Sequence, residues 1–250
     1  MLHRLETAKS NAAASDKTPV VYVVDDDESI RLSMHSLIRS VRLRVETFET
    51  PDEFLAFARY DAPSCLVLDV RLPETNGLTF QAKAAQFGVR MPILFITGHG
   101  DIEMTVRAMK AGAVNFLQKP FREQDLLDAV AEALNRDAIR RDAESSLAAV
   151  SLSFESLTER ERDVMKRVVE GALNKQIAYE MNLSEVTIKV YRGQVMRKMG
   201  SRNLPDLVRK AEALSLGSHT VRERADSMRR SPAREPSVSN SSIERESRQH

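Results

Sequence analysis

Cysteine is nearly absent from this chain of 250 residues, in which only Cys65 is present. A single cysteine cannot form an intramolecular disulfide, so a disulfide-stabilised fold is excluded and a reducing compartment, the cytoplasm, is expected. No apolar run approaches the ~20 residues that a transmembrane helix needs, so we expect no membrane partner. The first residues also lack the apolar stretch of a signal peptide, which predicts a polar, disordered leader at 1–18.

Net charge is also nearly absent, at +1 for the whole chain, but this average conceals an uneven distribution. Residues 19–135 carry 12 basic and 17 acidic side chains, whereas residues 184–202 carry five basic side chains and one acidic side chain. The length suits two domains. This asymmetry is typical of an acidic module joined to one that binds nucleic acid.

Five short strand-like runs alternate with helical patterns between residues 19 and 135. The runs at 19–24, 65–69, 92–97 and 114–117 are almost continuously apolar, as expected of strands that are buried on both faces. The run at 44–48 alternates between apolar and polar residues. This order predicts an α/β fold with a five-stranded parallel sheet and helices on both faces.

Reactive side chains stand at the carboxyl ends of four of these strands. They are Asp25 and Asp26 after the first strand, Asp69 at the end of the third, Thr97 at the end of the fourth, and Lys119 shortly after the fifth. In parallel sheets these ends meet at one edge, where ligands bind. Clustered carboxylates repel one another, and Mg²⁺ relieves that repulsion by taking oxygen ligands. The set therefore favours phosphoryl transfer onto a carboxylate, with Mg²⁺ as the cofactor.

These residues resemble the signature of the receiver domain of two-component response regulators, which has a flavodoxin-like fold. The resemblance covers residues 19–135 and implies that Asp69 accepts a phosphoryl group from a cognate histidine kinase. It implies that Asp26, Asp69 and the Arg71 carbonyl ligate Mg²⁺ directly, with Asp25 acting through water. It also implies a switch pair, Thr97 and Phe116, and a cis peptide bond between Lys119 and Pro120.

A second, all-helical domain is predicted at 154–215. Thr158 and Glu161 have the spacing of a capping box before a helix that ends at Gly171. Asn174 is expected to cap a short helix, and a tight turn then leads to a longer basic helix at 185–199. A short helix, a turn and a longer helix form a helix-turn-helix, whose second helix enters the major groove of DNA.

Two polar segments flank this helical domain. Residues 136–153 are charged, rich in alanine and free of glycine and proline, which favours a helical linker, with a flexible linker as the alternative. Residues 216–250 are rich in serine and have no aromatic residue, so we expect a disordered tail.

Residues 157–213 resemble the LuxR-type DNA-binding domain, in the segments Leu-Thr-Glu-Arg-Glu, Asn-Lys-Gln-Ile-Ala and Thr-Ile-Lys-Val-Tyr-Arg. Together the two halves resemble the FixJ branch of the NarL/FixJ response regulators, which are not enzymes. The resemblance implies a homodimer on phosphorylation and promoter DNA as partner, with RNA polymerase as a further candidate. It places Thr187, Lys189, Val190 and Gly193 in the groove, and Arg192, Arg197 and Lys198 nearer the DNA backbone.

Other interpretations of the same residues stay open at this point. The chain could be a phosphotransfer enzyme or a phosphate sink whose second domain docks a protein. It could also bind DNA independently of phosphorylation. The basic helix could be a solvated face without a nucleic-acid partner. A gel shift on genomic fragments, with and without phosphorylation, distinguishes these classes.

Overall fold

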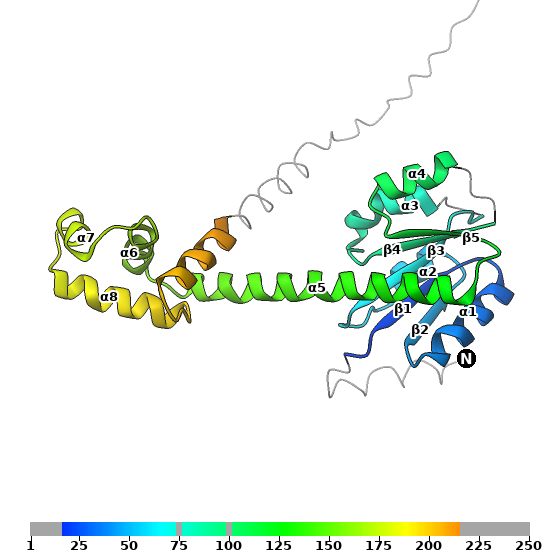
Figure 1. Cartoon of the computed structure of the whole chain (residues 1–250), viewed down its shortest axis with the longest axis horizontal. Helices are drawn as coiled ribbons and strands as arrows, with labels where there is room; N and C mark the ends of the chain where they lie inside the picture. The colour runs from blue at the N-terminus through cyan, green and yellow to red at the C-terminus, as the bar shows by residue number, and fades with distance from the viewer. Residues whose placement is uncertain (1–16, 74–76, 99–101, 216–250) are drawn as a thin grey trace, which may run out of the picture. The chain divides into compact units, whose positions relative to one another are not determined.

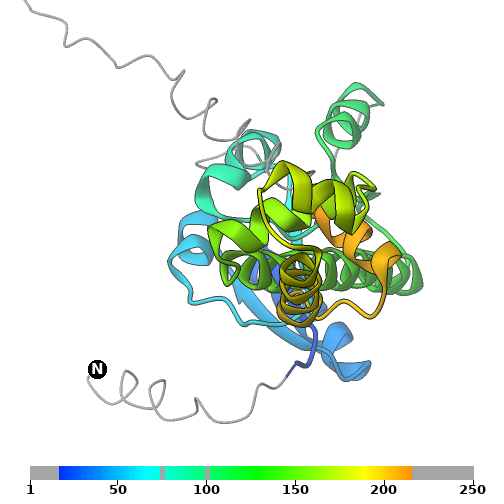
Figure 2. The ribbon, with the colours of Figure 1, turned by 90° about the vertical axis from the view of Figure 1, so that its left-hand side faces the viewer.

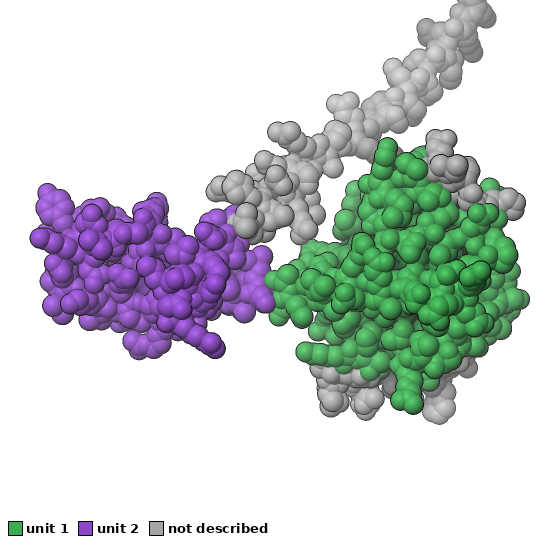
Figure 3. All heavy atoms as spheres, viewed as in Figure 1, with its two compact units in different colours: residues 1–145 green, residues 146–250 purple. Residues whose placement is uncertain are grey.

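The computed structural model describes residues 17–73, 77–98 and 102–215, which fall into two compact units, residues 1–145 and 146–250 (Figures 1 and 3). Apart from residues 17 and 18, the predicted leader and the tail at 216–250 lie outside the described residues. Within the described ranges, no helix combines the length and the apolar character that crossing a membrane requires.

Unit 1 contains a five-stranded parallel sheet, as the sequence predicts. The strands lie in the order β2-β1-β3-β4-β5 and have these bounds: β1 (Val20–Val24), β2 (Arg44–Phe48), β3 (Ser64–Asp69), β4 (Ile93–Thr97) and β5 (Asn115–Gln118). The register pairs Val24 of β1 with Leu68 of β3. The next residue on each strand is an aspartate, so the register brings Asp25 and Asp69 side by side at the carboxyl edge.

Helices cover both faces of this sheet (Figures 1 and 2). One face packs against α1 (Glu28–Ser40) and the first turns of α5 (Glu123–Glu155). The opposite face packs against α2 (Pro51–Ala56), α3 (Gly77–Ala84) and α4 (Ile102–Lys110). At Ala85 the chain changes from α3 to a 3₁₀ turn, η1 (Ala85–Phe87), which ends at Gly88 with a φ of 69°.

Alternate side chains of β1 enter two different cores. Val21 and Val23 point toward α1 and α5, whereas Tyr22 enters an aromatic cluster under α2. The Tyr22 ring packs edge-on against Phe54, with 5.4 Å between ring centroids. Its buried hydroxyl accepts a hydrogen bond from the Tyr60 backbone N–H at 3.0 Å, which ties the chain before β3 to the centre of the sheet.

Helix α5 continues through the whole of the segment that the sequence predicts as a linker. It runs without a break from Glu123 to Glu155, and its residues up to 145 belong to unit 1. This part of the helix is not polar on every side, because Asp137 is completely buried.

Unit 2 is a bundle of short helices: α6 (Glu159–Val169), α7 (Asn174–Glu180), α8 (Glu185–Lys198) and a helical segment at 204–215. The predicted capping box at the start of α6 is confirmed, since Thr158 and Glu161 exchange both hydrogen bonds. The predicted cap at Asn174 is wrong, because Leu173 occupies the N-cap position of α7. The Asn174 side chain instead accepts a hydrogen bond from Arg192 on α8 at 2.8 Å.

Candidate functional site

Three aspartates gather at the carboxyl edge of the sheet in unit 1. Asp25 follows β1 directly and is fully buried, Asp69 ends β3 and is nearly so, and Asp26 is exposed. One carboxylate oxygen from each of the three lies within 4.8 Å of the others. The sequence predicts this cluster from the ends of separate strands, and the parallel register is what brings it together.

Lys119 completes this cluster from the loop after β5. Its ammonium donates a hydrogen bond of 2.7 Å to Asp25 Oδ2 and another of 2.7 Å to Asp69 Oδ2. The Lys119 backbone N–H donates to the Thr97 carbonyl at 2.7 Å, which fixes the loop beside β4. The predicted cis peptide bond between Lys119 and Pro120 is confirmed.

Backbone donors hold the second oxygen of both buried carboxylates. The Asp27 N–H donates to Asp25 Oδ1 at 3.0 Å, and the Arg71 N–H donates to Asp69 Oδ1 at 2.9 Å. Each carboxylate is therefore fixed between a backbone N–H and the Lys119 ammonium. Hydrogen bonds of this kind to an ionised group are the stronger ones in proteins, so the geometry of the cluster is well determined.

Burial and pairing act in opposite directions on the charges of this site. Burial raises the pKa of the Asp25 carboxyl, and it does so by more than the hydrogen bond from Lys119 lowers it. For Lys119, burial lowers the pKa, but its hydrogen bonds to Asp25 and Asp69 raise it on balance. Lys119 is therefore protonated at neutral pH, as a group that binds phosphoryl oxygens must be.

The donor set fits a divalent cation. Asp25, Asp26 and Asp69 offer carboxylate oxygens, which Mg²⁺ prefers, and they come from two neighbouring strand ends. Three carboxylates against the single ammonium of Lys119 leave an excess of negative charge, which a divalent ion would neutralise. Mg²⁺ bound there would neutralise the oxygens of a transferring phosphoryl group.

Thr97 and Phe116, the predicted switch pair, lie on neighbouring strands. Thr97 ends β4 and is completely buried. Phe116 of β5 pairs with Phe95 of β4 and packs, partly buried, against the core on the α2, α3 and α4 side. The switch role itself stays a prediction.

Two further residues shape this site, and neither is singled out from the sequence. A Cβ added at Gly77, where α3 begins, would lie 2.6 Å from the Asp69 carbonyl oxygen, so only glycine fits there without a shift. The Arg31 guanidinium donates to the carbonyls of Asp25 and Asp26 at 2.8 and 2.9 Å and thereby fixes the turn after β1. The one sequence signal that could have indicated Gly77 is a glycine at the end of a polar run, just before a helical pattern begins.

Helix α8 in unit 2 carries the predicted nucleic-acid face. Its Ile188 and Val195 are buried in the core, while Lys189, Val190 and Arg197 are exposed. A Cβ added at Gly193 would meet no atom of the described residues within 4 Å, so this position is open to a ligand. Thr187 is half-buried, and its hydroxyl lies 2.8 Å from the Ser184 hydroxyl at the start of the helix.

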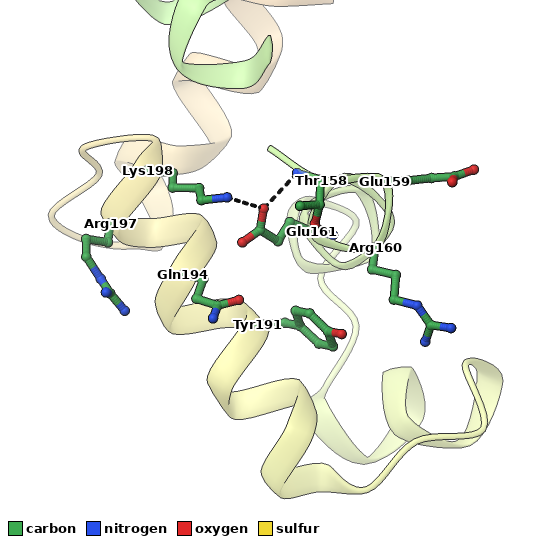
Figure 4. Close-up of a pocket in the computed structure, with 8 residues that line it drawn as sticks. All are labelled: Thr158, Glu159, Arg160, Glu161, Tyr191, Gln194, Arg197 and Lys198. Carbon is green, nitrogen blue, oxygen red and sulfur yellow. Dashed lines mark hydrogen bonds and ion pairs between the residues drawn. The ribbon is translucent and has the colours of Figure 1, made fainter. Parts of the chain in front are cut away.

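Two of the predicted DNA contacts have partners within unit 2. Arg192 donates to Asn174, and the Lys198 ammonium donates to Glu161 Oε2 at 2.7 Å and to the Ser156 carbonyl at 3.2 Å. The Lys198 ammonium holds the pKa of the buried Glu161 carboxyl below its ordinary value. Figure 4 shows Lys198 pointing toward Glu161, whereas Arg197 points away from it. Lys198 and Glu161 both line a hollow of about 630 Å³ between α6 and α8.

Comparisons with known proteins match each unit to a family. Residues 21–131 match the response regulator receiver domain, and residues 155–211 match the bacterial regulatory proteins of the luxR family. Nodulation protein W of Bradyrhizobium diazoefficiens is 52% identical over 200 residues, which are 80% of this chain and 88% of that protein. The chain therefore belongs to the response regulators that join a receiver domain to a LuxR-type DNA-binding domain, a family of transcriptional regulators and not of enzymes.

Within this family the chain is similar to proteins of the FixJ type. The transcriptional regulatory protein FixJ of Rhizobium meliloti is 37% identical over 198 residues, which are 79% of this chain and 97% of that protein. The response regulator StyR, whose structure has been solved, shares 46% sequence identity with this chain, and the two structures have a TM-score of 0.72. The match covers 78% of this chain and 98% of the StyR chain.

Proposed function

We propose that Asp69 accepts a phosphoryl group and that this event controls DNA binding by unit 2. The contact of Lys119 with both Asp25 and Asp69 is the observation that carries the proposal. A cognate histidine kinase would supply the group as a phosphohistidine. The P–N bond to its imidazole breaks, the electron pair stays on the imidazole nitrogen, and a P–O bond forms to a carboxylate oxygen of Asp69.

This chain would contribute positioning and charge to the transfer. The Arg71 N–H holds one oxygen of Asp69, so the other oxygen is the nucleophile. That second oxygen is the one bonded to Lys119, whose ammonium would shift to an oxygen of the incoming phosphoryl group. Asp25, Asp26, Asp69 and the Arg71 carbonyl would hold Mg²⁺, with Asp25 bonding through water.

The response to phosphorylation would pass through Thr97 and Phe116. We propose that Thr97 turns toward the phosphoryl group, that Phe116 moves inward, and that the face formed by α4, β5 and α5 then forms a homodimer. The dimer would present two α8 helices to DNA half-sites about 34–36 Å apart. RNA polymerase is the partner that such a promoter complex would meet.

The exposed face of α8 would enter the major groove. Lys189, Val190 and Gly193 are open on that face, and Arg197 is exposed one turn further on. By contrast, Arg192 and Lys198 are already paired inside unit 2, so we propose that they orient α8 and that any contact they make with DNA comes second.

The test is labelling by acetyl phosphate in Mg²⁺, followed by promoter binding with and without phosphorylation. Asp69→Asn should abolish labelling, while Asp27→Asn, which keeps the helix cap beside the site, should label normally. Lys189→Ala should weaken promoter binding by about 1 kcal/mol or more. Lys166→Ala, the same charge change at an exposed position of α6, should have little effect.

Each alternative function gives a different result in the same assays. Labelling without any DNA binding would indicate a phosphate sink. DNA binding that phosphorylation leaves unchanged would indicate a regulator that is independent of the receiver. Labelling of Asp69→Asn at the wild-type rate would remove Asp69 from its proposed role.

A further inference from the structure

A buried carboxylate attaches α5 to the amino-terminal edge of the sheet. Asp137 has no exposed surface, and its Oδ2 accepts a hydrogen bond from the Ser64 backbone N–H at 2.9 Å. Ser64 is the first residue of β3, the strand that ends in Asp69. The helix that leads toward unit 2 is therefore bonded to the strand that carries the proposed phosphoacceptor, at the end opposite the phosphoacceptor.

Arg140 neutralises this buried charge. Its Nε and Nη2 both donate to Asp137 Oδ1, at 3.0 and 2.8 Å. Its remaining nitrogen, Nη1, donates to Glu144 Oε2 at 2.8 Å. Both oxygens of Asp137 are thus satisfied, and the arginine links this contact to the next turn of α5.

The next turns of the same helix make two more connections to unit 1. Arg141 pairs with Asp61, in the segment that precedes β3, and Glu144 lies 3.7 Å from Arg90, in the segment that precedes β4. We call Asp137, Arg140, Arg141 and Glu144, with their partners, the α5 latch. The latch holds the segment 136–145 against unit 1, although this segment lies beyond the residues that match the receiver family.

Polar contacts provide most of the attachment of the segment 136–145 to the rest of unit 1. The apolar stripe of α5 that packs on the sheet ends at Leu134, and Ile139 is 62% exposed. Removing one partner of a buried charged contact is costly, because the other partner is left buried and unpaired. Most of the stability of a helix in a protein comes from its tertiary contacts, so this segment depends on its polar ones. Without Asp137, the segment 136–145 should therefore detach or fray.

We propose that Asp137 is a positioning residue that keeps the linker between the units short. This inference rests on the proposed function. With the latch closed, only residues 146–155 of α5 lie beyond unit 1; with the latch open, residues 136–155 do, which is twice the length. Once the released segment frays it acts as a flexible linker, for which the effective concentration of a tethered domain falls with about the 3/2 power of length. Opening the latch should therefore weaken DNA binding by the phosphorylated dimer about threefold.

The experiment compares the full chain with Asp137→Ala and with Ile139→Ala, an exposed control two residues away. Hydrogen exchange of the backbone amides at 136–145 should be at least about tenfold faster in Asp137→Ala and unchanged in the control. Labelling at Asp69 should keep the wild-type rate in both variants. Promoter affinity of the phosphorylated protein should fall about threefold in Asp137→Ala alone.

Two further variants separate linker length from general damage. Asp137→Asn keeps an oxygen for the Ser64 N–H but loses the charge that pairs with Arg140, so its effects should be intermediate. Ten flexible Gly/Ser residues inserted after Ser145 should reproduce the loss of affinity while leaving exchange at 136–145 unchanged.

Three results would count against the inference or its basis. Unchanged exchange in Asp137→Ala would overturn the latch itself. Faster exchange with wild-type promoter affinity would overturn its effect on DNA binding. If wild-type protein binds DNA equally with and without phosphorylation, the proposed function fails, and the exchange measurement still decides whether the latch exists.

Discussion

Gly77 is the position where the smallest substitution should do most damage to the phosphoacceptor site. A methyl group there would lie 2.6 Å from the Asp69 carbonyl oxygen, 3.1 Å from Val70 Cα and 3.2 Å from the ring of Phe95. Two of these neighbours are backbone atoms of the strand end that carries Asp69, so no flexible side chain can move aside. The backbone itself must shift.

The size of the effect follows from these distances. An ordinary contact begins near 3.4 Å, so the Asp69 carbonyl must move by about 0.8 Å to accept the methyl group. Overpacking of a tight core costs about 1–3 kcal/mol. Alanine is favoured over glycine in a helix by up to about 1 kcal/mol, which offsets part of that cost. We expect Gly77→Ala to lose about 1–2 kcal/mol of unfolding free energy.

Gly77→Ala should slow phosphoryl transfer to Asp69 more than it lowers the stability of the fold. A displacement approaching 1 Å can slow a positioned reaction by about 10²-fold, so labelling of Gly77→Ala by acetyl phosphate should fall at least about tenfold. Hydrogen exchange of the β1 and β3 amides in the full chain measures the stability loss. Gly98→Ala is the stability control, because a Cβ at that position meets no described atom within 4 Å. Equal stability and equal labelling rates in Gly77→Ala and wild type would refute the reasoning.

Two other contacts give predictions of the same kind. Because the pKa of Glu161 is lowered from 4.5 by Lys198, the pair stabilises unit 2 above pH 4.5 and loses this effect as the pH falls further. Glu161→Gln should therefore cost about 1–2 kcal/mol at pH 7 and flatten the decline of the unit 2 melting temperature below about pH 5. Tyr22→Phe should cost about 1 kcal/mol in denaturant unfolding, since the Tyr60 N–H loses its acceptor. Tyr60→Phe, whose hydroxyl bonds Glu46 at the surface, should cost less, and the reverse order would contradict this account.

The parts of the molecule that could be predicted from the sequence depend on local signals. Buried strands show as short apolar runs, and because the sheet is parallel, whatever follows each run meets at one edge. That is why Asp25, Asp69 and Lys119 could be grouped although 94 residues separate the first from the last. The capping box of Thr158 and Glu161 needs only a spacing of three residues, and it is present.

Partners of charged side chains could not be predicted in the same way. The basic residues of α8 look alike in the sequence, and the resemblance to the LuxR-type domain assigns all of them to DNA. The packing of α8 against α6 and α7 gives two of them partners inside unit 2: Lys198 meets Glu161, 37 residues away, and Arg192 meets Asn174, 18 residues away. Such pairs depend on how the helices cross, which apolar spacing leaves undetermined.

Asp137 shows how helical spacing carries information even where polarity misleads. Charged residues at 136–153 suggest an exposed linker, and a fully buried aspartate is rare unless it is paired. Yet Leu126, Val130 and Ala133 form the buried stripe of α5, and the next position at that spacing is Asp137. A carboxylate on a buried stripe must find donors, and the backbone N–H of Ser64, at the start of β3, is such a donor. Extending the stripe by one turn therefore predicts that unit 1 continues beyond residue 135, with a polar contact in place of an apolar one.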